Sequence, residues 1–210
     1  MNRVLWPSMK RSLIAILRGV EPSEIEAIAA GLMEEGFEAI EVPLNSPDPF
    51  TSIELARKLA TSSCLIGAGT VLTVEDVDRL ADVGGDLMVS PNVVPEVIAK
   101  ASTAGMVSMS GVFTPTESLL AAQAGVSALK FFPANVLGPT GIKAIRAVLP
   151  KEVAVGAVGG VSEVDFAAYA QAGITTFGLG SSLYKPGATA KEVKVKARAI
   201  IAAYDSVYIG

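Results

Sequence analysis

The chain has 210 residues, half of them hydrophobic, and carries 17 basic and 21 acidic side chains, so its net charge is −4. The one basic cluster, Lys191 to Arg198, is typical of the solvated face of a helix, so nucleic-acid binding is not expected. The absence of histidine from the sequence excludes Ser-His-Asp catalysis and His-ligated zinc. Proton transfer must therefore depend on carboxylates, Lys, Tyr or water.

The single cysteine, Cys64, cannot form an internal disulfide. The first residues lack the apolar stretch of a signal peptide, and the longest early apolar run, Leu13–Leu17, is too short to span a membrane. These features predict a cytoplasmic protein without a membrane partner.

Short apolar runs alternate with longer amphipathic stretches along the chain. The runs predict eight strands, over Leu13–Leu17, Ala39–Val42, Leu65–Ala68, Leu87–Val89, Met106–Met109, Ala128–Phe132, Ala154–Val158 and Thr176–Leu179. The stretches predict helices over Ser23–Glu35, Pro49–Ala60, Val74–Val83, Pro95–Ser102, Thr116–Gln123, Ile142–Leu149, Glu163–Ala172 and Lys191–Tyr204. C-cap glycines are expected to end five of the helices: Gly36, Gly84, Gly105, Gly125 and Gly173.

Eight strand-helix units predict an α/β fold, a (β/α)8 TIM barrel, as a single domain over residues 1–210 with a short N-terminal extension of about residues 1–11. A doubly wound open sheet is the alternative, but no Gly-rich dinucleotide fingerprint follows the first strand. In a barrel the active site lies at the C-terminal ends of the strands. The candidates there are Arg18, Glu41, Thr70, Ser90, Ser110, Lys130, Gly159, Gly160, Gly180 and Ser181.

Lys130 lies inside an apolar strand and shares a face with Ala128 and Phe132. Burial disfavours the ammonium form, lowers the pKa and makes a nucleophilic amine available. The alternative interpretation is a lysine whose stem lies along the strand end while its amine reaches solvent.

Glu41 ends the second predicted strand, where a carboxylate points toward the barrel mouth. It is a candidate acid and base for a chain without histidine. A structural ion pair with Arg18 on the neighbouring strand is an equally good interpretation. Thr70, at the end of the third strand, is expected either to hydrogen-bond a ligand or to cap the next helix, a role for which Thr73 competes.

Two glycine pairs follow the last two strands, at Gly159-Gly160 and around Gly178-Leu-Gly180. Glycines here allow backbone N–H groups to approach a phosphate, the usual phosphate position of such barrels. Glycine pairs also occur in tight turns, so each pair alone is a weak signal.

Six segments together resemble, in order, the motifs of the 2-keto-3-deoxy-6-phosphogluconate/phosphogalactonate aldolase family. They are Leu17-Arg18-Gly19, Glu41-Val-Pro-Leu-Asn-Ser-Pro47, Gly67-Ala-Gly-Thr-Val71, Lys130-Phe-Phe-Pro-Ala134, Val158-Gly-Gly-Val161 and Gly178-Leu-Gly-Ser181. The resemblance covers nearly the whole chain, and the Lys-Phe-Phe-Pro-Ala segment is its most specific element.

The resemblance implies a class I aldolase on a (β/α)8 barrel, a homotrimer that forms pyruvate and needs neither metal nor cofactor. By position, it implies that Lys130 forms the Schiff base and that Glu41 is the general acid and base. It implies a pyruvate site bordered by Arg18, Thr70 and Pro91 and a phosphate site formed by Gly159, Gly160, Gly180 and Ser181.

The segment Pro43-Leu-Asn-Ser46 resembles the phosphogalactonate branch, because gluconate-type members usually carry an arginine where this chain has Asn45. Asn45 is therefore a predicted substrate contact. Ser110-Gly111 departs from the Pro-Gly that is common in the family.

The expected reaction is cleavage of the sugar-acid phosphate 2-dehydro-3-deoxy-6-phosphogalactonate to pyruvate and D-glyceraldehyde 3-phosphate. The gluconate epimer or 4-hydroxy-2-oxoglutarate, cleaved by the same mechanism, is the alternative. A pentose-phosphate epimerase is less favoured, because such sites generally use histidines and a metal. A non-catalytic barrel that binds sugar phosphates remains a further alternative.

Overall fold

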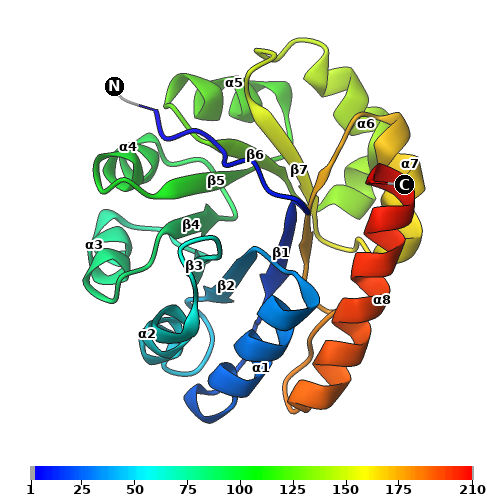
Figure 1. The fold of residues 1–210 in the computed structure, drawn as a ribbon. Coiled ribbons are helices and arrows are strands. Elements are labelled where there is room, and N and C mark those ends of the chain that lie inside the picture. The colour runs from blue at the N-terminus through cyan, green and yellow to red at the C-terminus, as the bar shows by residue number, and fades with distance from the viewer. Residues whose placement is uncertain (1–2, 210) are drawn as a thin grey trace.

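The computed structural model describes residues 3–209, which form the predicted closed barrel (Figure 1). Residues 1, 2 and 210 of the predicted domain lie outside the described residues. The eight strands of the described chain are parallel and follow one another in sequence order, with the last pairing back to the first. They are β1 (Leu13–Ile16), β2 (Ala39–Pro43), β3 (Leu65–Gly69), β4 (Leu87–Ser90), β5 (Val107–Val112), β6 (Ala128–Phe131), β7 (Ala154–Val158) and β8 (Thr176–Leu179). The barrel prediction is confirmed, and the open-sheet alternative is wrong.

Helices surround the barrel on its outside (Figure 1). They are α1 (Pro22–Glu35), α2 (Pro49–Leu59), α3 (Val74–Asp82), α4 (Pro95–Thr103), α5 (Pro115–Gln123), α6 (Ala134–Arg146), the 3-10 turn η1 (Glu163–Asp165), α7 (Phe166–Gln171) and α8 (Ala190–Tyr208). All five glycines predicted to end helices have positive φ angles, as left-handed C-caps require. In the described residues no helix is long and apolar enough to cross a bilayer.

Several boundaries differ from the sequence predictions, and α8, for example, runs to Tyr208 rather than ending at Tyr204. Strand β5 continues to Val112, past the predicted end at Met109, because residues 110–112 continue to pair with β6, although Ser110 and Gly111 interrupt the apolar run. Helix α6 starts at Ala134 rather than at Ile142. Its first turns are interrupted at Gly138 (φ 70°, ψ 167°), which precedes a proline, so the apolar helical period becomes recognisable only beyond this kink.

Side chains alternate between the two faces of each strand, which determines what enters the barrel. The inward positions build a cluster that includes Ala39 of β2 and Ala128 of β6, while the outward positions pack against the helices in a larger core. Glu41 and Lys130 each lie two residues beyond one of these alanines, so both side chains point inward near the C-terminal ends of their strands.

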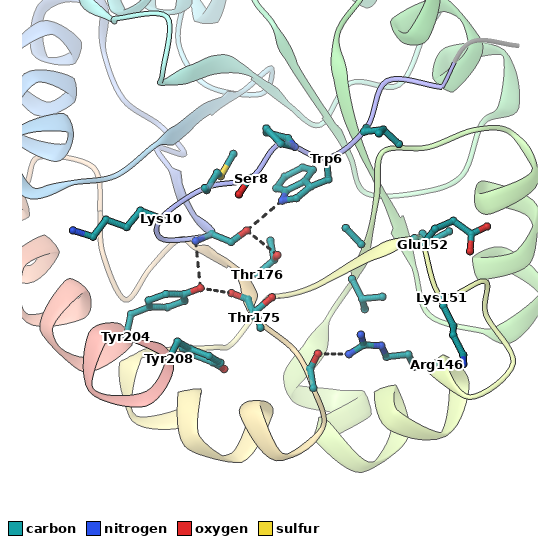
Figure 2. Close-up of a pocket in the computed structure, with 18 of the residues that line it drawn as sticks. Trp6, Ser8, Lys10, Arg146, Lys151, Glu152, Thr175, Thr176, Tyr204 and Tyr208 are labelled. Carbon is teal, nitrogen blue, oxygen red and sulfur yellow. Dashed lines mark hydrogen bonds between the residues drawn. The ribbon is translucent and has the colours of Figure 1, made fainter. Parts of the chain in front are cut away.

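The segment before β1 crosses the N-terminal end of the barrel, where Val4, Trp6 and Met9 pack against the inner cluster. A hollow of about 640 Å³ lies between this segment and α8 (Figure 2). Hydrogen bonds connect residues that line this hollow, for instance the bond of 3.2 Å that Trp6 Nε1 donates to Ser12 Oγ. Lys10 lies on one side of the hollow, and Lys151 and Arg146 lie on the other (Figure 2).

Candidate active site

A cavity of about 160 Å³ opens at the C-terminal ends of the strands. Nine of the twelve site residues named from the sequence line it: Arg18, Glu41, Thr70, Pro91, Lys130, Gly159, Gly160, Gly180 and Ser181. The other three, Asn45, Ser90 and Ser110, do not. Gly178, the first glycine of the second predicted pair, also lines it, and four lining residues were not singled out from the sequence: Ile16, Phe132, Val158 and Val161. Inward alternation along each strand is the signal that finds some of them, because Phe132 and Val158 continue the inward faces of β6 and β7.

Lys130 is only 6% exposed, so its amine does not extend into solvent. Its register partners, Gly111 of β5 and Gly156 of β7, have no side chains. The Nζ atom lies 5.0 Å from the centroid of the Phe132 ring. Burial lowers the pKa of Lys130, partly opposed by the nearby charge of Glu41 and reinforced by that of Arg18. The lysine is therefore held in surroundings that favour its neutral, nucleophilic form.

Glu41 is 1% exposed, and its Oε2 atom has no hydrogen-bond partner among the described residues. Burial raises the pKa of Glu41 to about 7, against the charges of Lys130 and Arg18, which lower it. A carboxyl group with such a pKa can both accept and donate a proton near neutral pH.

Arg18 forms no ion pair with Glu41 within 4.0 Å, although both residues lie in the described chain. Its Nη1 instead donates a hydrogen bond of 2.5 Å to Oδ1 of Asn45. The alternative interpretation of Glu41 as the partner of a structural ion pair is therefore not realised. Asn45 itself does not line the cavity, and its direct contact with substrate stays a prediction.

Thr70 adopts a left-handed backbone conformation (φ 58°), which is rare for a β-branched residue and typical of functional or strained positions. It is not the cap of α3, because Thr73 Oγ1 accepts the hydrogen bond from the backbone N–H of Asp76 at 3.1 Å. Thr70 thus stays available to the cavity that it lines.

Ser90 and Ser110, candidates from the sequence, are buried but do not line this cavity. Ser90 Oγ lies 3.2 Å from Ser110 Oγ and donates to the backbone carbonyl of Asn92 at 2.8 Å. These contacts hold the turn that places Pro91 in the cavity wall.

The two glycine loops form the side of the cavity next to β7 and β8. Gly159 and Gly160 have φ angles of 93° and 68°, and a Cβ on Gly160 would lie 2.4 Å from Asn135, so the fold itself requires both glycines. Gly180 differs, because its φ is not positive and a Cβ would meet only Ile16, at 3.9 Å. Following β7, the predicted helix over residues 163–172 begins with the 3-10 turn η1 and continues as α7.

A buried lysine and a buried carboxylate that share one cavity at the mouth of a (β/α)8 barrel fit the class of barrel enzymes that use an amine nucleophile. In the described residues no group of three or more His, Cys, Asp or Glu side chains is arranged to hold a metal ion. The family model described as "KDPG and KHG aldolase" matches residues 8–198, and the chain belongs to this aldolase family.

Particular relatives agree with this assignment. Over its full length the chain is 66% identical to the probable 2-dehydro-3-deoxy-6-phosphogalactonate aldolase of Rhizobium meliloti, of which it covers 99%. It is 45% identical over 195 residues to the 2-dehydro-3-deoxy-6-phosphogalactonate aldolase of Escherichia coli K12, with 93% of this chain and 95% of the relative covered. A solved structure described as native KDPGal superimposes with a TM-score of 0.94 at 43% identity, covering 98% of this chain and 100% of that one.

Proposed function

We propose that the chain is a class I aldolase that cleaves 2-dehydro-3-deoxy-6-phosphogalactonate to pyruvate and D-glyceraldehyde 3-phosphate through a Schiff base on Lys130. The observation that carries the proposal is the burial of Lys130 in one small cavity with Glu41, of which two glycine loops form one side. The printed names of the two relatives described above support the choice of substrate.

Lys130 supplies the electrons for the first bond. Its neutral amine attacks the C2 ketone and forms a carbinolamine, which loses water to give a protonated imine. The C3–C4 bond then breaks, and its electron pair moves toward the imine nitrogen to form an enamine. Protonation at C3 and hydrolysis release pyruvate and restore the amine. The low pKa that burial imposes on Lys130 supports this role.

Glu41 transfers the protons that these steps require. As a carboxylate it takes the proton of the C4 hydroxyl while the C3–C4 bond breaks, and this step releases the aldehyde. As a carboxylic acid it returns a proton to C3 of the enamine. The raised pKa of Glu41, about 7, supports both roles because each protonation state is accessible near neutral pH.

The remaining cavity residues suit the two ends of the substrate. We assign the pyruvate end to Arg18, Thr70 and Pro91, since a guanidinium pairs well with a carboxylate. We assign the phosphate to the loops around Gly160 and Gly180. Neither backbone conformation nor packing within the chain requires a glycine at position 180. Close approach of a ligand to the backbone therefore explains the glycine there best.

The gluconate epimer and 4-hydroxy-2-oxoglutarate, cleaved by the same mechanism, are the second candidate, supported by the family to which the chain belongs. Pyruvate release from each C4 epimer, coupled to NADH oxidation by a dehydrogenase, separates the candidates. The proposal predicts a higher kcat/KM for the galactonate epimer. A preference for the gluconate epimer would overturn the substrate assignment, and no release from either would overturn the enzymatic function.

We also propose a homotrimer and a cytoplasmic location. Partly exposed Phe113, Phe132 and Val136 line an apolar hollow of about 330 Å³ that a second subunit would cover, which supports association. Sedimentation equilibrium tests the trimer, and a monomeric mass at micromolar concentration would contradict it. The one cysteine, Cys64, which is buried, suits a reducing compartment.

A further inference from the structure

Gly69 ends β3 directly beneath the carboxyl group of Glu41. A Cβ built on Gly69 would lie 2.0 Å from Oε2, 2.5 Å from Oε1 and 2.4 Å from Cδ of that side chain. All three distances are far below van der Waals contact. The Glu41 carboxyl group therefore occupies the space that any other residue at position 69 would fill.

Backbone conformation does not explain this glycine. Gly69 is absent from the glycines of positive φ, and its backbone belongs to a regular parallel ladder in which it pairs with Pro43. The carbonyl of Gly69 accepts a hydrogen bond of 2.8 Å from the N–H of Leu44. An alanine could adopt this conformation, and the three nearest atoms that its Cβ would meet all belong to the Glu41 carboxyl group.

We propose that Gly69 is a positioning residue, which holds the Glu41 carboxylate at its place in the cavity by leaving open the space against the β3 backbone. The inference rests on the proposed function, in which Glu41 transfers the protons. No group of the described chain donates a hydrogen bond to Oε2 of Glu41, so packing against β3 takes the place of a hydrogen bond in fixing that end of the carboxylate.

The obstructing atoms are the far end of a flexible side chain. In Gly69→Ala the barrel should therefore fold, while the carboxyl group rotates away from β3. A displacement of about 1 Å at a catalytic group reduces turnover by about 100-fold. We expect kcat to fall by about this factor with a small change in KM. We also expect the ionisation of Glu41 seen in the pH profile of kcat to move to lower pH, because the displaced carboxylate loses burial.

Two further variants isolate the effect. Gly31→Ala adds the same methyl group on α1, where the nearest atom would be Lys194 Cβ at 3.7 Å, and should leave kcat unchanged. Glu41→Asp retracts the carboxyl group from β3 by one methylene. In that background Gly69→Ala should reduce kcat by less than about tenfold, since residues in contact show non-additive effects.

The assay is pyruvate release from the galactonate epimer by the intact chain, with circular dichroism to confirm folding. Wild-type inactivity would overturn the proposed function itself. With an active wild type, an unchanged kcat and pH profile in Gly69→Ala would overturn the positioning role. If Gly69→Ala caused the same loss in the wild-type chain and in the Glu41→Asp variant, the role would be overturned as well, because the effect would then not act through the carboxylate.

Discussion

Replacing Glu41 by Gln should change the free energy of unfolding in a pH-dependent way. The variant minus wild-type difference should be larger at pH 8 than at pH 5. The pKa of Glu41 is about 7 in the folded chain against 4.5 for the free group, because burial penalises its charge. Between these pH values the folded state binds more protons than the unfolded state, so the free energy of unfolding falls as pH rises. At 1.36 kcal/mol for each pH unit, the full difference is about 3 kcal/mol.

Gln occupies nearly the same volume as a protonated Glu and has no charge to bury, so this pH-dependent loss disappears in the variant. Because Glu41 is largely protonated at pH 5, the substitution removes no charge there, and the charge difference beside Lys130 develops only as pH rises.

The measurement is urea unfolding followed by circular dichroism at pH 5, 6, 7 and 8, at one fixed protein concentration. Between pH 5 and pH 8 the variant minus wild-type free energy of unfolding should rise by about 2.5 kcal/mol, because part of the full difference has already developed at pH 5. Glu26→Gln, on the exposed side of α1, is the matched control and should show no such rise. A difference that is constant between pH 5 and pH 8 would refute the argument that Glu41 is buried at a cost to stability.

Other expectations follow from single contacts. Asn45→Ala removes the acceptor that holds Arg18, so KM for the sugar-acid phosphate should rise about tenfold with little change in kcat, and an unchanged KM would contradict this role. Thr73→Ala removes the N-cap of α3 and should lower the free energy of unfolding by about 1 kcal/mol without affecting kcat. Urea titration measures the first quantity and the pyruvate assay the second. An unaltered urea midpoint would count against the cap.

The residues that share the cavity were predictable because barrels place strand ends together. Once eight strand-helix units were recognised, Lys130 and Glu41 fell on strand ends at inward positions, and the glycines after the last two strands fell beside them. Alternation along a strand is a local property, so a single sequence contains it.

Contacts between segments distant in sequence were not predictable in the same way. The hydrogen bond from Arg18 to Asn45 depends on the path of the loop after β2, which no residue pattern specifies. The fit of the Glu41 carboxyl group against Gly69 depends on the register of two neighbouring strands. The start of α6 was missed because Gly138 and Pro139 interrupt its helical period.

Trapping the imine shows whether Lys130 forms the Schiff base. The chain is incubated with pyruvate and sodium borohydride, digested, and the modified peptide is sequenced by mass spectrometry. We expect one reduced pyruvate adduct, on Lys130, and no adduct in Lys130→Arg or without pyruvate. An adduct on another lysine, or none in a wild type that cleaves the substrate, would contradict the Schiff-base assignment.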